Sequence, residues 1–293
     1  MTELRQSRVN AGDLEFPTLE AGPSDGKLVL CLHGFPDHPR SWRLLLPELG
    51  RAGWRAVAPA LRGYAPSAQP QNACYQVAAA SRDALGIAEA LGAERCALVG
   101  HDWGAAVVAG AAILGAERVS KLVTLAVPHG TFGPALMTRY AQQKRSWYMF
   151  LFQLPLAEMI VAADDFAFVD RLWEDWSPGY ELPPDERKAL KETLAAPGVL
   201  TAALGYYRAT LSGQNVDPAL ADDTAAINGP VPVPALHLHG ADDGCIGADI
   251  CDGMEAFFPA GLRKRIVEGA GHFLQLERPD VVNPEILDFL GAP

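Results

Sequence analysis

A carboxylate in a tight turn is the group in this sequence best placed to do chemistry. The turn reads Gly100-His101-Asp102-Trp103-Gly104, between an apolar run at 96–99 and an Ala/Val/Gly-rich segment that continues to Leu114. A strand that turns directly into a helix exposes its middle residue, and glycines on both sides remove Cβ atoms that would clash. The helix N-terminus adds N–H donors, which suits a nucleophile. Alternatively, Asp102 serves only as the N-cap of the helix.

Further acidic groups and a histidine follow strand-like runs. Asp242 and Asp243 come after the run 235–239, and His272 comes after the run 263–267. In open α/β sheets, ligands bind beyond the carboxyl ends of the strands, so these groups are expected near Asp102. The order acid, acid, histidine matches nucleophile, orienting acid and base in enzymes that use a nucleophilic turn, with aspartate in place of the usual serine.

The elements that must position these groups alternate between strands and helices. Continuous apolar runs predict strands buried on both faces, as in a parallel sheet, and apolar residues at helical spacing predict the helices. The expected fold class is α/β, with a doubly wound and mostly parallel sheet. The predicted strands are 27–33, 54–58, 96–99, 121–127, 235–239 and 263–267, and the predicted helices are 41–49, 77–91, the segment ending at 114 and 284–290.

The pattern changes between residues 130 and 229, where strand-like runs disappear. Aromatic residues recur there at helical spacing, with Pro and Gly as breaks. Helices are expected at 146–163, 165–176, 185–195 and 199–211. We therefore expect a first core segment at 1–129, an inserted helical cap at 130–229 and a second core segment at 230–293.

Composition excludes several classes of partner. The net charge of −11 and pI near 5.1 oppose binding to nucleic acid or an anionic membrane. The start of the chain shows no apolar signal segment, and the apolar stretch 149–163 is shorter than the ~20 residues of a membrane span. Five cysteines without CxxC spacing indicate reduced thiols. We expect a cytoplasmic protein without a cofactor, and a homodimer stays open.

Several histidines have more than one interpretation. His237 and His239 share one face of a predicted strand, and with Asp242 they could bind zinc. Both lie in a predicted buried strand with no further metal cluster nearby in sequence, so structural roles and no metal are expected. His33 and His101 lie beside the glycine turns and are expected to brace these loops by hydrogen bonds.

Four motifs together resemble one known family. They are His33-Gly34-Phe35-Pro36, Gly100-His101-Asp102-Trp103-Gly104, the turn at 240–243 and Gly269-Ala270-Gly271-His272-Phe273. The sequence is similar over nearly its whole length to the epoxide hydrolase branch of the α/β-hydrolase superfamily. The first two motifs form a specific pairing, whereas the last two are shared across the superfamily. The G-x-x-D spacing of the family favours Asp243 over Asp242 as the partner of His272.

The resemblance implies a role for each site residue. Asp102 would attack an epoxide to form an alkyl ester, and His272, oriented by Asp243, would activate the water that hydrolyses it to a vicinal diol. Backbone N–H groups of Phe35 and Trp103 would form the oxyanion hole. Two cap tyrosines would donate to the epoxide oxygen. Tyr148 and Tyr207 fall at their positions, Tyr206 is the rival of Tyr207, and Phe35, Trp103, Tyr206 and Trp147 are expected to contact a small apolar or aromatic epoxide.

Other functions remain as alternatives. A haloalkane dehalogenase would share the aspartate nucleophile, but it needs two donors for a halide, and Phe35 stands where one is expected. A fluoroacetate dehalogenase typically has arginines where Trp103 and Ala106 stand here. A noncatalytic binding protein with this fold often loses one of the acid–acid–histidine set, and this chain keeps all three. Epoxide hydrolysis is therefore favoured, on the site rather than on the fold alone.

Overall fold

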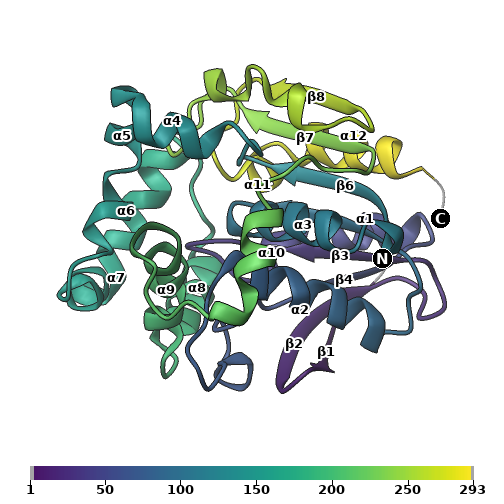
Figure 1. Cartoon of the computed structure of the whole chain (residues 1–293), viewed down its shortest axis with the longest axis horizontal. Helices are drawn as coiled ribbons and strands as arrows, with labels where there is room; N and C mark the ends of the chain where they lie inside the picture. The colour runs from purple at the N-terminus through teal and green to yellow at the C-terminus, as the bar shows by residue number, and fades with distance from the viewer. Residues whose placement is uncertain (1–2, 292–293) are drawn as a thin grey trace.

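A computed structural model describes residues 3–291 and contains one eight-stranded sheet (Figure 1). The strand order is β1-β2-β4-β3-β5-β6-β7-β8, in which β1, β2 and β4 pair antiparallel and all other neighbours pair parallel. The predicted doubly wound, mostly parallel sheet is confirmed. The strands are β1 Arg5–Ala11, β2 Leu14–Ala21, β3 Leu28–Leu32, β4 Arg55–Pro59, β5 Cys96–His101, β6 Val119–Leu125, β7 Ala235–Gly240 and β8 Leu262–Val267.

The core lies on both faces of this sheet. Along β3, Leu28, Leu30 and Leu32 pack into one hydrophobic cluster, and Val29 and Cys31 pack into the other. This alternation explains the continuous apolar run, because both sets of side chains are removed from water. Residues of α2 (Val77–Ala90) and α3 (Trp103–Leu114) cover the first face, and residues of α1 (Leu46–Arg51) and α12 (Pro279–Leu290) cover the second.

A helical segment follows β6 and precedes β7 (Figure 1). We call residues 130–229 the cap segment, and within it the structure contains no strand. No helix among residues 3–291 has the length and apolarity needed to cross a membrane. The cap helices are α4 Phe132–Thr138, α5 Tyr140–Arg145, α6 Trp147–Leu151, α7 Ala157–Trp176, α8 Pro184–Ala195, α9 Val199–Ser212 and α10 Ala221–Ala226.

Local boundaries differ from the predictions where apolar spacing was the only signal. The β1–β2 hairpin was not predicted, because its first strand is mostly exposed and polar. The helix expected at 41–49 is a 3₁₀ turn, Pro39–Trp42, followed by α1. The helix expected at 146–163 breaks after Leu151 and resumes at Ala157. The predicted boundary at 164 agrees with the structure, because residues 163–166 of α7 have non-helical backbone angles and form a kink between two helical parts. Helix α12 starts at Pro279, with Pro284 inside it.

Candidate active site

Asp102 occupies the corner between β5 and α3. Its backbone is strained, with φ 52° and ψ −123°, and its side chain does not cap the helix. Instead, its Oδ1 accepts a hydrogen bond from the Phe35 N–H at 2.7 Å. Glycines permit this approach, because a Cβ on Gly34 would lie 2.2 Å from Asp102 Oδ1 and one on Gly104 would lie 2.0 Å from Leu32 O. With Oδ1 held in this way, the second oxygen, Oδ2, is left on the side of His272.

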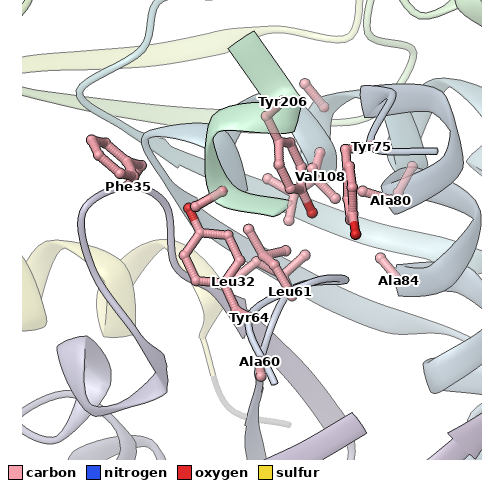
Figure 2. Packing of buried hydrophobic residues seen from close by; sticks show 14 of the residues in the cluster. Leu32, Phe35, Ala60, Leu61, Tyr64, Tyr75, Ala80, Ala84, Val108 and Tyr206 are labelled. Atoms are coloured by element: carbon pink, nitrogen blue, oxygen red, sulfur yellow. The ribbon is translucent and has the colours of Figure 1, made fainter. Parts of the chain in front are cut away.

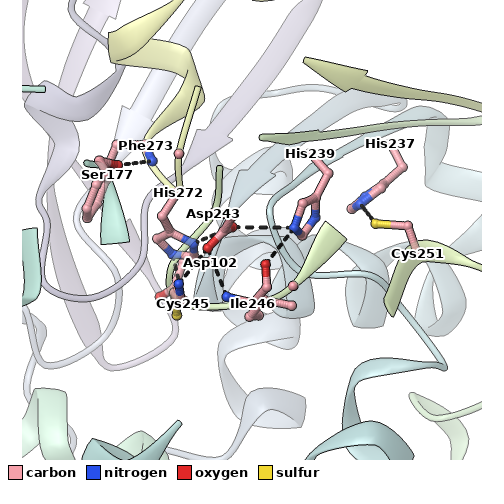
Figure 3. Close-up of polar contacts among 12 residues, drawn as sticks. Asp102, Ser177, His237, His239, Asp243, Cys245, Ile246, Cys251, His272 and Phe273 are labelled. Atoms are coloured by element: carbon pink, nitrogen blue, oxygen red, sulfur yellow. Dashed lines mark hydrogen bonds and ion pairs between the residues drawn. The ribbon is translucent and has the colours of Figure 1, made fainter. Parts of the chain in front are cut away.

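His272 joins Asp102 to Asp243 (Figure 3). Its Nδ1 lies 2.9 Å from Asp243 Oδ2, and its Nε2 lies 3.5 Å from Asp102 Oδ2. All three side chains are buried, whereas Asp242 is exposed. The loops after β5, β7 and β8 thus bring together the residues expected from the sequence, with Asp243 rather than Asp242 beside the histidine. We call these three residues the Asp–His–Asp cluster.

The charges in this cluster stabilise one another. Burial alone would lower the pKa of His272, but the carboxylates of Asp243 and Asp102 outweigh burial and raise it to about 10. Burial would likewise raise the pKa of Asp243, but the neighbouring His272 outweighs this effect and lowers it. The resting cluster therefore holds an imidazolium between two carboxylates.

The end of α7 holds two of the loops that form the cluster. The carbonyl oxygen of Trp176 accepts hydrogen bonds from the N–H of His272 at 2.9 Å and from the N–H of Gly244 at 3.1 Å. A Cβ on Gly244 would lie 1.9 Å from the carbonyl oxygen of Asp175, so glycine is required for this contact. Sequence analysis missed this role, because a backbone acceptor leaves no residue-specific signal.

Tyr148 and Tyr207, the two tyrosines singled out from the sequence, are buried side by side in the cap segment. The ring of Tyr207 packs edge-on against Trp103, with centroids 4.9 Å apart, and against Phe35 at 5.5 Å. The ring of Tyr148 lies 5.8 Å from that of Tyr207, and its hydroxyl contacts Cys245 Sγ at 3.3 Å. Burial raises the pKa of both phenols well above its usual value, so both keep their proton. Among residues 3–291, the Tyr207 hydroxyl meets no hydrogen-bond partner of normal geometry.

Tyr206 and Trp147 are placed differently from these two. The Tyr206 hydroxyl donates to the carbonyl oxygen of Arg62 at 3.0 Å, and its ring packs beside Tyr75 (Figure 2). Tyr206 still lines the site through its ring, 5.6 Å from that of Trp103. Trp147 is 45% exposed and packs on Phe168, so the structure does not bring it to the cluster. Its position on the outer face of the short helix α6 is the physical reason.

Cys245 is a residue of the site that sequence analysis did not predict. Its N–H donates to Asp243 Oδ1 at 2.7 Å, and its thiol contacts the Tyr148 hydroxyl. One carboxylate oxygen of Asp243, the sulfur of Cys245 and one ring nitrogen of His272 all lie within 4.8 Å of one another. The only signal in sequence was its place two residues after the predicted orienting acid. Cys245 therefore connects the Asp–His–Asp cluster to the cap.

Comparisons with known proteins identify the family of the chain. The model of the alpha/beta hydrolase fold matches residues 27–279. Epoxide hydrolase 3 of Xenopus tropicalis is 33% identical over 291 residues, covering 97% of this chain and 76% of the relative. Epoxide hydrolase 4 of Homo sapiens is 30% identical over 293 residues, covering 97% and 77%.

Solved structures give the same result. The epoxide hydrolase of Bacillus megaterium, solved in complex with an inhibitor, is 29% identical with a TM-score of 0.82, over 97% of this chain and 99% of that chain. Epoxide hydrolase A of Mycobacterium thermoresistibile is 28% identical with a TM-score of 0.82, over 98% of each chain. The protein belongs to the epoxide hydrolase family of the alpha/beta hydrolase fold.

Proposed function

We propose that this protein hydrolyses small apolar or aromatic epoxides to vicinal diols through an ester on Asp102. The observation that carries the proposal is the placement of Asp102. One oxygen is held by the Phe35 N–H, the other lies 3.5 Å from His272 Nε2, and two buried phenols lie on the cap side. The names of the relatives support the same activity.

In the first step, Asp102 Oδ2 attacks a ring carbon of the epoxide. The ring C–O bond breaks as the new C–O ester bond forms, and the leaving oxygen takes a proton from Tyr148 or Tyr207. A free phenol, with a pKa of ~10, is a much stronger acid than water or an alcohol. Burial raises the pKa of both phenols, but the alkoxide that forms beside them is removed from water as well and remains the stronger base. The unpartnered hydroxyl of Tyr207, judged over residues 3–291, has no internal hydrogen bond to break before it donates.

In the second step, His272 changes from cation to base. Asp102 loses its charge when it becomes an ester, which removes one of the two anions that hold the pKa of His272 high. The His272 proton passes to the tyrosine phenolate left by the first step, and Nε2 then accepts a proton from water as the water oxygen attacks the Asp102 carbonyl carbon. The oxyanion forms on Oδ1, where the Phe35 N–H already donates and the Trp103 N–H is the expected second donor. Such donors contribute roughly 3 kcal/mol each. When this intermediate collapses, the ester C–O bond breaks and the diol oxygen takes the proton from His272 Nε2. The proton of the new Asp102 carboxyl group then returns to His272 and restores the imidazolium.

The lining of the site favours an apolar substrate. The rings of Phe35, Phe152 and Tyr207 pack against one another at 5.0–5.5 Å, and all three are buried. Trp176 closes the side next to His272, with ring centroids 5.2 Å apart. These walls offer hydrocarbon and aromatic surface, so binding is expected to follow the apolar area that the substrate buries.

The test is one turnover of excess enzyme with styrene oxide in ¹⁸O-labelled water. Label in the peptide that contains Asp102, with mostly unlabelled diol, is the expected result. Labelled diol from the first turnover with unlabelled Asp102 would mean direct attack by water and would exclude the ester. A panel of bromoalkanes is the matched control, because halide release without diol formation would assign dehalogenation instead.

We also propose that the protein acts in the cytoplasm. The support is that Cys31, Cys74, Cys96, Cys245 and Cys251 are all free and buried within the described chain. Fractionation of the native cells with an antibody to the protein tests this location, and recovery outside the cytoplasmic fraction would contradict it.

A further inference from the structure

A second group of buried side chains with atoms that could bind a metal ion lies on the core side of Asp243. It consists of His237 and His239 on β7 and Cys251 at the end of a 3₁₀ turn, Ala248–Cys251. Figure 3 shows His239 between Asp243 and the pair of His237 and Cys251. All three residues are buried, and one donor atom from each lies within 4.8 Å of the others. We call them the His–His–Cys group.

The distance between two of these donors matches a metal site. Cys251 Sγ lies 3.5 Å from His237 Nε2. In a tetrahedral zinc site, bonds of about 2.3 Å to sulfur and about 2.0 Å to nitrogen leave those two ligand atoms about 3.5 Å apart. The third ligand atom, on His239, lies within 4.8 Å of the other two, so the site closes by an inward movement of that side chain.

The outer ring nitrogens are already fixed in the way metal sites require. His237 Nδ1 lies 2.9 Å from Thr124 Oγ1, and His239 Nε2 lies 2.9 Å from the carbonyl oxygen of Ile246. A carbonyl can only accept, so His239 Nε2 carries the proton and Nδ1 presents its lone pair. Such second hydrogen bonds orient metal-binding imidazoles and set their tautomer.

One of these lone pairs has nothing to bind within the described chain. His239 Nδ1 is fully buried, and no donor among residues 3–291 reaches it. A buried polar atom without a partner is unfavourable by about 1–3 kcal/mol. A hydrogen bond from the Cys251 thiol to His237 Nε2 accounts for that pair, but it leaves His239 Nδ1 unexplained.

We propose that His237 Nε2, His239 Nδ1 and Cys251 Sγ bind one thiophilic divalent cation of the zinc class. The metal–sulfur bond forms as the S–H bond breaks, and the thiol proton passes to the buffer. Two neutral imidazoles and one thiolate leave a complex of charge +1. The nearby Lys264 cation is compensated, because its Nζ lies 2.6 Å from Glu255 Oε1.

A cation bound to the His–His–Cys group would stabilise the fold and, through His239, would also affect Asp243. It would tie the 3₁₀ turn to β7 and so close the loop 241–251, which carries Asp243. His239 Nε2 also lies 3.4 Å from Asp243 Oδ2. A cation on the opposite nitrogen strengthens this N–H as a donor. This proposal does not depend on the chemistry of the cap side.

The test uses the untagged full chain, treated with chelator and titrated with Co²⁺ alone. One equivalent of Co²⁺ with tetrahedral d–d bands and a thiolate-to-cobalt band, displaced by Zn²⁺, is expected. Saturating Zn²⁺ is expected to raise Tm by at least about 3 °C. Cys251→Ser and His239→Gln should lose the thiolate band and the shift, whereas Cys74→Ser, outside the group, should keep both.

Two results would overturn the proposal. One is a folded wild-type chain that shows neither the thiolate band nor the Tm shift, which needs no variant to fold. The other is a band that survives Cys251→Ser but disappears in Cys245→Ser, because that would place the cation among Asp243, Cys245 and His272. Epoxide turnover is measured in parallel as a separate readout, so the absence of diol would count against the proposed function and not against the metal site.

Discussion

The two sides of the Asp–His–Asp cluster differ in how their polar atoms are satisfied. On the core side, Asp243 Oδ1 accepts from two backbone N–H groups, His33 Nε2 accepts from the N–H of Leu61, and His101 Nε2 donates to the carbonyl oxygen of His272. On the cap side, the Tyr207 hydroxyl, Trp103 Nε1 and His272 Nε2 find no partner of normal geometry within residues 3–291. Buried polar atoms are almost always paired, so the unpartnered atoms mark the cap side as a ligand site. On the core side, His101 Nδ1 and His239 Nδ1 likewise lack a partner within residues 3–291.

The largest expected effect comes from removing the nucleophile that separates these two sides. Asp102→Asn keeps an oxygen for the Phe35 N–H but cannot form the ester readily. Turnover is expected to fall by at least about 10⁴-fold, with Tm little changed. Steady-state diol formation measures this, with the protein mass confirming that residue 102 stays Asn. More than about a tenth of the wild-type rate would rule out Asp102 as nucleophile.

Replacing the base should separate the two chemical steps. His272→Gln leaves Asp102 and the phenols in place but cannot take a proton from water, so the ester is expected to accumulate. Turnover should fall by about 10²–10⁴-fold, while one equivalent of epoxide is still consumed in a burst. Intact-protein mass spectrometry would detect the adduct, and peptide mapping after digestion would locate it on the peptide containing Asp102. Loss of turnover without a burst would instead place His272 in the first step.

The tyrosines test the contrast between the two sides directly. The Tyr206 hydroxyl has a hydrogen-bond partner, whereas the Tyr207 hydroxyl has none within residues 3–291. Tyr207→Phe and Tyr148→Phe are each expected to lower kcat by about 10-fold, and the double variant by about 10²-fold or more. Tyr206→Phe is the matched control. The Tyr206 hydroxyl donates to the carbonyl oxygen of Arg62, so Tyr206→Phe is expected to lower the free energy of unfolding by about 1 kcal/mol. The kcat of this variant should stay within about 3-fold of wild type. The reverse order of effects would make Tyr206 the second acid.

The charge pattern of the cluster predicts a pH-dependent stability. The pKa of His272 is raised to about 10 in the folded state, above its unfolded value near 6.5. Its contribution to the free energy of unfolding is therefore fully present below pH 6.5 and is lost as pH rises to 10. Urea unfolding of wild type and His272→Gln across this range isolates the effect. A constant difference between the two curves would contradict it.

The sequence predicted residues whose role depends on side-chain type and missed those whose role depends on backbone or orientation. The Asp102 corner follows from glycines that remove Cβ clashes, whereas the choice of Asp243 over Asp242 came from the G-x-x-D pattern of the family that the sequence resembles. The Trp176 carbonyl is available in any residue, so no pattern could mark it. Trp147 and Tyr148 are neighbours on one short helix, and only the packing of α6 decides which of them faces the cluster. Cys251 meets His237 through a turn whose path apolar spacing does not determine.

Cys245 offers the smallest expected effect and the finest test of the boundary between the two sides. Sulfur is a weak hydrogen-bond partner, so the Tyr148 hydroxyl is oriented by Cys245 Sγ yet easily released to a substrate. Cys245→Ser should hold the phenol more strongly and raise KM, whereas Cys245→Ala should orient it less and lower kcat, each by about 3-fold, or roughly 0.7 kcal/mol.

A double-mutant cycle with Tyr148→Phe identifies whether Cys245 acts through that phenol. In the Tyr148→Phe background no hydroxyl remains to be oriented, so both Cys245 substitutions should change kcat and KM far less than in wild type. Equal effects in the two backgrounds would show that Cys245 acts only through the loop that carries Asp243. In that case the core side would influence the reaction only through Asp243. The Tyr148 and Tyr207 phenols would then be oriented entirely by the aromatic rings around them.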